Sequence, residues 1–156
     1  QEFPGEPLVV ASSLAEGTDR LVAKRIMARN QASLVAILPL PKDDYRKDFT
    51  SQESNEEFDG LLKVSLEVIE LPAARSRAEA YAVAGRFVIE HSDVLIAVWD
   101  GKEAQGQGGT GEIVALARLR GIPIAWVHAG NRKPGTEEPT SLGEEQGTVT
   151  FEGFSV

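Results

Sequence analysis

Ser92-Asp-Val-Leu-Ile-Ala-Val-Trp-Asp-Gly101 contains the stretch that decides the fold, a nearly continuous apolar run from Asp93 to Trp99. A strand that is apolar on both faces is typical of the interior of a parallel sheet. After it, Thr110 to Arg120 is predicted to form an amphipathic helix that ends at Gly121. Ile122 to Val127 is predicted to be the next buried strand. This order predicts an α/β protein with parallel strands.

The preceding part of the chain shows the same alternation. Short apolar runs predict strands at Leu8 to Ala11, Ser33 to Leu40 and Glu67 to Leu71. The first helix is predicted from Gly17 to about Asn30. Its apolar face is predicted to hold Leu21, Val22, Ile26 and Met27.

Two further helices are predicted from their first residues. Ser54-Asn-Glu-Glu57 and Ser76-Arg-Ala-Glu79 both fit the Ser-x-x-Glu capping box, in which the two side chains satisfy backbone N–H groups reciprocally. One helix should therefore cover about residues 55 to 66, and the other should open at Ser76. The glycine-rich and proline-rich residues 129–147 are predicted to be a flexible loop, with an edge strand over Thr148 to Phe154.

Length and composition support one domain. The 156 residues, of which 42% are hydrophobic, can fill a single core. We therefore expect residues 1–156 to form one domain, a three-layer Rossmann-like parallel sheet with helices on both faces.

Charge and residue counts exclude several functions. The net charge of −8 opposes non-specific binding to nucleic acid or to acidic lipid. The chain has no cysteine, which excludes disulfides and thiolate catalysis, and its two histidines, His91 and His128, do not suggest a metal site. No apolar run approaches the roughly 20 residues needed to span a bilayer, and no signal peptide is recognisable, so a cytoplasmic location is expected.

The ligand is expected beyond the carboxyl ends of the strands, where helix N-termini present free N–H groups. The strongest signal there is Gly106-Gln-Gly-Gly-Thr-Gly-Glu112. Gly108, Gly109 and Thr110 are predicted to bind phosphate or ribose, although a flexible loop with an ordinary helix cap is the alternative. In either case the Glu112 carboxylate would interact favourably with the positive end of the helix dipole. Glu112 could also hold a ribose or act as a nucleophile or base at a glycosidic carbon.

Other candidates lie in the remaining loops of the same edge. After the first strand they are Ser13, Gly17, Thr18 and Asp19, where Thr18 or Asp19 is expected to cap the helix and Asp19 could instead orient an arginine. Tyr45 is predicted to stack on a base, and Arg46 and Arg75 to neutralise a phosphate. Asp100 should project from the ligand edge, whereas a structural or exposed role is expected for His128.

Several motifs together resemble the SLOG superfamily, which includes the LOG phosphoribohydrolases and DprA-type proteins. The motifs are Leu14-Ala-Glu-Gly-Thr-Asp19, Leu38-Pro-Leu-Pro41, Tyr45-Arg46, Ser92 to Gly101 and Gly108-Gly-Thr110. The resemblance covers about residues 8 to 128 and implies a Rossmann-like domain that binds nucleotides or nucleotide-derived signals. Gly109-Thr-Gly-Glu112 followed by Gly121-Ile-Pro is also similar to nucleoside deoxyribosyltransferases, in which the corresponding glutamate attacks the sugar.

The chain departs from these families in two places. Their glutamate is the third residue after the threonine, whereas Glu112 is the second, and one residue turns a helix by about 100°. Related domains also have another strand before the one at Leu8, where this chain has only Gln1 to Pro7. The chain is then expected to be a fragment, to be completed by another chain, or to begin its fold differently, and Glu2-Phe3 could be a cloning remnant.

The leading hypothesis is a domain that binds a nucleotide or nucleotide-sugar, as a sensor, with no cofactor or metal required. The alternative is an enzyme that cleaves an N-glycosidic bond with Glu112 and Asp19 as catalytic residues. A partner-binding scaffold with a vestigial pocket is the third class. The expected partner is a small-molecule nucleotide rather than nucleic acid or a membrane, and assembly into a homo-oligomer stays open.

Overall fold

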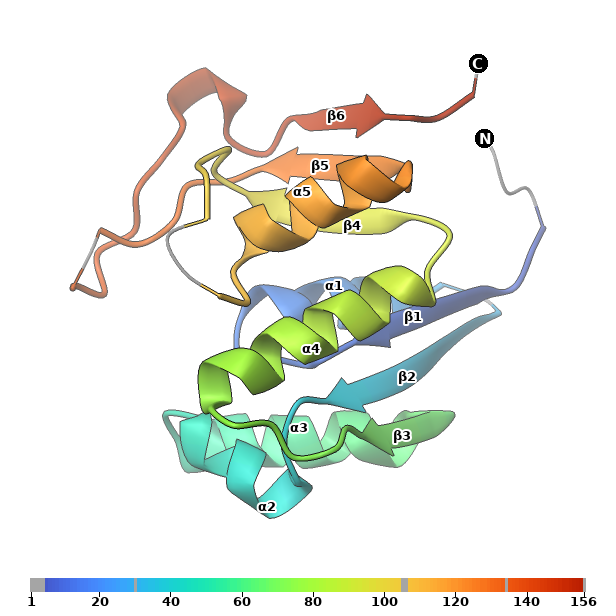
Figure 1. Ribbon diagram of the computed structural model, residues 1–156, viewed down its shortest axis with the longest axis vertical. Coiled ribbons are helices and arrows are strands. Elements are labelled where there is room, and N and C mark those ends of the chain that lie inside the picture. The colour runs from blue at the N-terminus through green and yellow to red at the C-terminus, as the bar shows by residue number, and fades with distance from the viewer. Residues whose placement is uncertain (1–4, 30, 105–106, 134, 156) are drawn as a thin grey trace. The chain divides into compact units, whose positions relative to one another are not determined.

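The computed structural model describes residues 5–29, 31–104, 107–133 and 135–155. Asn30, Gly106 and residues 1–4, including Glu2 and Phe3, lie outside this part. The chain is an α/β protein that divides into two compact units, residues 1–84 and 85–156 (Figure 1). In chain order, the elements of the described residues are β1 (Leu8–Ser12), α1 (Thr18–Met27), β2 (Ala32–Leu38), α2 (Lys42–Tyr45), the 3-10 helix η1 (Arg46–Asp48), α3 (Gln52–Val64), β3 (Glu67–Glu70), α4 (Arg77–Glu90), β4 (Leu95–Trp99), α5 (Thr110–Arg120), β5 (Ile124–His128), η2 (Gly143–Glu145) and β6 (Val149–Glu152).

The first unit contains a parallel sheet in the order β1-β2-β3. Val10 lies opposite Leu34, and Ile37 lies opposite Ile69. Because all three strands run in the same direction, their carboxyl ends share one edge of the sheet. The turn from β1 to α1 and the turn from β2 to α2 leave the sheet at this edge.

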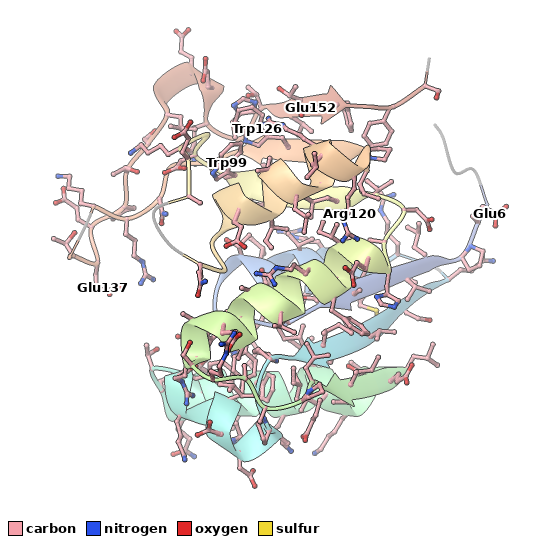
Figure 2. The ribbon with its side chains drawn as sticks, viewed as in Figure 1. Glu6, Trp99, Arg120, Trp126, Glu137 and Glu152 are labelled. Carbon is pink, nitrogen blue, oxygen red and sulfur yellow. The ribbon has the colours of Figure 1, made fainter. Side chains whose placement is uncertain are left out.

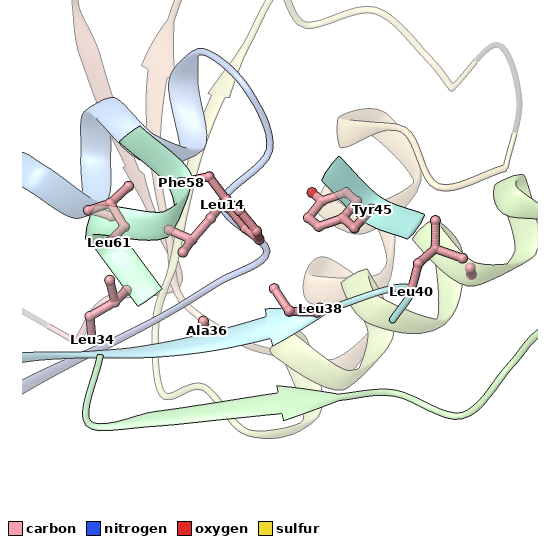
Figure 3. Packing of buried hydrophobic residues seen from close by; sticks show 10 residues of the cluster. Leu14, Leu34, Ala36, Leu38, Leu40, Tyr45, Phe58 and Leu61 are labelled. Atoms are coloured by element: carbon pink, nitrogen blue, oxygen red, sulfur yellow. The ribbon is translucent and has the colours of Figure 1, made fainter. Parts of the chain in front are cut away.

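Alternate residues of β2 line one side of the hydrophobic core of the first unit. Leu34, Ala36 and Leu38 are fully buried together with Phe58 of α3, and Leu61 of the same helix is 7% exposed (Figure 3). Ile37, on the opposite face of the strand, is also buried. The sequence prediction that this strand is apolar on both faces is therefore confirmed.

The second unit contains a mixed sheet in the order β4-β5-β6. β4 and β5 are parallel, and Ala97 and Ile124 pack against Val114 and Ala117 of α5. β6 pairs with β5 in the antiparallel direction, which confirms the expected return of the chain as a further strand and corrects the expectation of purely parallel strands. The segment before β6 carries a bridge between Arg132 and Pro139.

One of the two predicted capping boxes was wrong. The N-cap of α3 is Ser51, whose hydroxyl accepts the Ser54 N–H at 3.1 Å. Ser51 has the extended backbone that an N-cap needs, whereas Ser54 lies buried inside the helix. The prediction at Ser76 is confirmed in part, because its hydroxyl accepts the Glu79 N–H at 3.1 Å. The Glu79 carboxylate accepts the Arg75 N–H at 2.7 Å.

The polar segment after β2 was expected to be a loop but contains α2 and η1. Pro41 precedes α2, and Asp43 and Asp44 occupy its first turn, where carboxylates interact favourably with the helix dipole. Within the described residues, no helix is long and apolar enough to cross a membrane.

We expect Ser51→Ala to lower the free energy of unfolding by about 1 kcal/mol, because the Ser54 N–H loses its acceptor. Ser51→Asp, which keeps an acceptor at the N-cap, should unfold near the wild-type midpoint. Urea unfolding of both variants measures the difference. Equal stability of Ser51→Ala and wild type would show that Ser51 does not cap α3.

Candidate functional site

The turn between β1 and α1 has an unusual backbone. Leu14 is fully buried and has φ +55°, a left-handed conformation that side chains other than glycine rarely adopt. Gly17 has φ +96° and is the N-cap of α1, which within the described residues has no side-chain hydrogen bond at this cap. The expectation that Thr18 or Asp19 caps the helix was therefore wrong. The helix begins at Thr18 because only glycine tolerates the preceding backbone conformation.

A buried arginine, Arg20, fixes this turn, and its role was not predicted from the sequence. Its Nε donates to the Leu14 carbonyl at 2.9 Å, and its Nη1 donates to the carbonyl and hydroxyl of Ser54 at 2.8 and 2.9 Å. Its Cζ lies 4.3 Å from the centre of the Phe49 ring. Arg20 thus ties the β1–α1 turn to α3, with its charge against an aromatic ring.

The helical pattern held a signal for this burial. Arg20 and Ala23 are buried, whereas Leu21, which was predicted to face the core, is 53% exposed. The buried face of α1 is thus rotated relative to the predicted one. An arginine on the inner face is visible only when positions 20 and 23 are taken together as neighbours on the helix.

Glu57 of α3 neutralises part of the Arg20 charge. Its carboxylate lies 2.5 Å from Lys24 Nζ and 3.1 Å from Arg20 Nη1. Hydrogen bonds from Lys24 and, to a lesser extent, from Arg20 lower the pKa of Glu57. Two cations therefore share one carboxylate, and the cluster keeps a net positive charge.

Asp19 and Glu16 flank the same turn and respond oppositely to it. Asp19 is exposed as a residue, yet desolvation of its carboxyl group raises its pKa, against a hydrogen bond from the Ala15 backbone and the charge of Arg20. Hydrogen bonds from Ser54 and Thr50 lower the pKa of Glu16. Ser13 is half-buried at the start of the turn.

Tyr45, expected to stack on a base, lies in the core. The residue is 1% exposed, and its ring makes edge contacts with Phe49, Phe58 and Tyr81. Burial is the main cause that raises its pKa. The ring is thus a core element, and only the hydroxyl group remains for a polar role.

The arginines expected at a phosphate have carboxylate partners. Arg46 Nη1 lies 3.2 Å from Asp59, and Arg46 Nε donates to Asn55 at 3.1 Å. Arg75 Nη2 lies 2.9 Å from Glu79, one turn further on. Each of the two guanidinium groups is therefore paired with a carboxylate of the same chain.

In the second unit, α5 begins at Thr110 after Gly109, an N-cap with extended backbone. In the described part of the chain, this N-cap receives no side-chain hydrogen bond. A side chain at Gly111 would come within 2.8 Å of the Ala104 backbone nitrogen and 2.9 Å of the Lys102 carbonyl oxygen. The glycines therefore let the loop after β4 approach the first turn of α5 closely.

Glu112 has a structural contact at this junction. Its carboxylate accepts the Gly108 N–H at 2.7 Å and lies 3.6 Å from Arg86 Nη2. Gly108, with φ +79°, thus sits one residue before the N-cap with its N–H already satisfied. The contacts of Glu112 favour a role in holding the loop over the catalytic one that was considered for it.

Trp99 ends β4 and Asp100 follows it, whereas Trp126 lies in the middle of β5. Asp100 accepts the Lys102 N–H at 3.1 Å, so it shapes the loop that follows β4. Trp99 and Trp126 lie side by side with ring centres 5.1 Å apart (Figure 2), and Trp126 stacks on His128 at 3.9 Å. His128 Nε2 is 2.8 Å from the Thr150 hydroxyl. The sequence did not indicate this aromatic stack.

Among the described residues, no group of three or more His, Cys, Asp or Glu could hold a metal ion. Comparison with known proteins found no matching family model and no matching curated protein.

We predict opposite pH dependences for Asp19→Asn and Glu16→Gln. A raised carboxyl pKa means that ionisation costs folding free energy above the unfolded value of 3.8. Asp19→Asn should therefore be more stable than wild type near neutral pH, by an amount limited by the exposure of Asp19. This advantage should disappear as the pH falls through the raised pKa toward 3.8.

Glu16→Gln serves as the matched control, because the pKa of Glu16 is lowered. It should be less stable than wild type at neutral pH and approach wild type as the acid range is entered. Thermal unfolding at several pH values measures both variants. A neutral-pH loss of stability in Asp19→Asn would contradict the desolvated carboxyl group.

Proposed function

We propose that this chain binds a nucleotide or a nucleotide-derived small molecule through an anionic group placed at the N-terminus of α5. The observation that carries the proposal is the helix start itself. α5 follows the carboxyl end of a parallel strand, and its N-cap is a glycine without a side-chain hydrogen bond among the described residues. The first-turn N–H groups and the positive end of the helix dipole are then available to an anion.

The nearby carboxylate of Glu112 is compatible with this anion site. It takes the N–H of Gly108, which precedes the N-cap, and Arg86 offsets its charge at 3.6 Å. The N–H groups of Thr110 and Gly111 follow the N-cap. Backbone N–H groups, rather than Arg46 or Arg75, are the phosphate donors in this proposal.

The finer expectations from the sequence belong to the same proposal. They are membership of the SLOG superfamily, a three-layer Rossmann-like arrangement and a cytoplasmic location. The start of α1 supports the Rossmann-like arrangement, because Gly17, like Gly109, is an N-cap without a side-chain hydrogen bond in the described residues and follows a parallel strand, although its backbone (φ +96°) differs from the extended backbone of Gly109. A sensor role needs only binding, so no catalytic step is assigned to Glu112.

Gly109→Asp tests the anion site without disturbing the fold. Its extended backbone suits any residue, and a side chain there meets open space. An aspartate would cap α5 and place a carboxylate where the ligand anion should lie. We expect unchanged or slightly higher stability and an affinity for the bound nucleotide that is about tenfold lower or weaker still.

Gly109→Ala is the control, since it adds a side chain without a charge. Titration calorimetry with AMP, ADP-ribose, NAD and cyclic dinucleotides measures affinity, and both tryptophans lie in the second unit as fluorescent reporters. The proposal fails if no compound of this set binds, or if Gly109→Asp binds as tightly as Gly109→Ala.

A further inference from the structure

β6 forms one edge of the sheet in the second unit. The strand order is β4-β5-β6, and among the described residues no strand pairs with the other side of β6 (Figure 1). Edge strands of soluble proteins usually carry Lys, Pro or an inward-pointing charge that discourages pairing with another chain. The four residues of β6, Val149-Thr-Phe-Glu152, include neither Lys nor Pro. This edge is therefore open to a further strand.

The pairing with β5 determines which backbone groups of β6 are left for that strand. The His128 N–H donates to the Thr148 carbonyl at 2.9 Å. In an antiparallel pair, alternate residues direct both of their backbone groups toward the neighbouring strand. The backbone groups of Thr148 and Thr150 therefore face β5. Those of Val149 and Phe151 face the outer edge, where a second strand can pair with them.

The side chains of Val149 and Phe151 add an apolar surface at the same edge. Val149 is 47% exposed and Phe151 is 67% exposed. The two side chains lie on one face of the sheet, because they are two residues apart in a strand. On β5, Val127 lies beside Val149 and Ala125 lies beside Phe151. The apolar surface thus continues from the inner strand to the edge, and a further strand would extend it.

The charge of β6 does not oppose the approach of a second strand. Glu152 lies on the opposite face from Phe151, and its carboxylate accepts hydrogen bonds from Arg118 Nε at 2.9 Å and Nη2 at 2.8 Å. A strand at this edge would thus meet no unpaired charge among the described residues of β6. A charged peptide would find no opposite charge there, so the edge favours a strand as uncharged as β6 itself.

β6 is also complementary to a second copy of itself. A two-fold axis through Thr150 places Val149 opposite the partner's Phe151, and Thr150 opposite the partner's Thr150. Aromatic residues opposite β-branched residues, and threonine opposite threonine, are favourable cross-strand pairs. We infer that two copies of this chain associate through antiparallel pairing of β6, which joins their two three-stranded sheets into one. This interface does not depend on anion binding at α5.

The size of the interface sets its strength. The proposed register forms roughly four backbone hydrogen bonds, two for each pair of Val149 and Phe151. The side chains that it buries are chiefly those two in each copy, which is little compared with the roughly 1,200–2,000 Å² that stable complexes bury. The net charge of −8 on each copy opposes association, and salt screens this repulsion. We therefore expect a dissociation constant of about 10–100 µM that decreases as salt is added.

Single-cysteine variants test the register, because the chain has no cysteine of its own. Thr150 and the partner's Thr150 form a pair without hydrogen bonds, in which the Cα atoms lie about 4.5 Å apart, within reach of a disulfide. Thr150→Cys should therefore form a covalent dimer when it is oxidised with diamide. Thr148→Cys is the matched control, since Thr148 is also exposed but lies about 13 Å along the strand from the partner's Thr148. Electrophoresis without reducing agent measures both variants.

Sedimentation velocity at about 10 and 500 µM protein measures the association of the wild type without cross-linking. Phe151→Lys places a charge at the edge and should weaken the dimer about tenfold or more. Leu119→Lys is its control, because Leu119 of α5 is an exposed apolar residue that lies outside β6. It should leave the dissociation constant within about twofold of wild type.

Three results would overturn the inference. The first is a wild-type protein that stays monomeric at the higher concentration in added salt. The second is equal association of Phe151→Lys and Leu119→Lys. The third is cross-linking of Thr148→Cys as fast as that of Thr150→Cys, which would show that the copies do not meet in the proposed register.

Discussion

The buried guanidinium group of Arg20 is the interaction on which the first unit depends. A buried cation is costly unless its donors find acceptors, and Arg20 finds them in the Leu14 carbonyl, in Ser54 and in Glu57. These acceptors come from the β1–α1 turn and from α3. The strained backbone of Leu14 is held in place because its carbonyl group is part of this network.

The same network holds the polar groups of the β1–α1 turn in place. Once Arg20 fixes Leu14, Gly17 starts α1 without a capping side chain, and Asp19 is kept beside the turn. The second unit solves a similar problem with different residues. There Glu112 holds the Gly108 N–H, and Gly109 starts α5. Within the described residues, α1 and α5 thus lack the stability that a side-chain cap would add.

The sequence was sufficient for most of the elements and for one helix in full. Thr110 to Arg120 was predicted with its observed bounds, because Gly121 adopts the left-handed conformation that ends a helix. The start of α3 was misplaced, since Ser51 and Ser54 are both good capping residues and only the backbone conformation distinguishes them. α2 was missed because four residues are too few for a periodic pattern.

The site was less predictable than the fold. Charged residues are expected at the surface, so Arg20 was not predicted to be buried although it shares a helix face with Ala23. Tyr45, an aromatic residue in a polar segment, suggested a ligand rather than the core. Arg46 pairs with Asp59 of α3, and such tertiary pairing is invisible in a local motif. Arg75 pairs with Glu79 four residues later, a local contact that was not predicted because Glu79 was assigned to the capping box at Ser76. Gly17 and Gly109 were singled out as candidate ligand residues of two loops, but their positions as N-caps were not predicted, because threonine and aspartate are the more usual capping residues.

Hydrogen exchange of the backbone amides in wild type and Arg20→Lys tests the role of Arg20 most directly. A lysine keeps the charge but cannot bind Leu14 and Ser54 at once, so amides of residues 14–20 and of the start of α3 should exchange faster. Amides of β4 and α5 serve as the internal reference. Unchanged exchange at residues 14–20 in Arg20→Lys would contradict the account, because the turn would then hold its conformation without the guanidinium group.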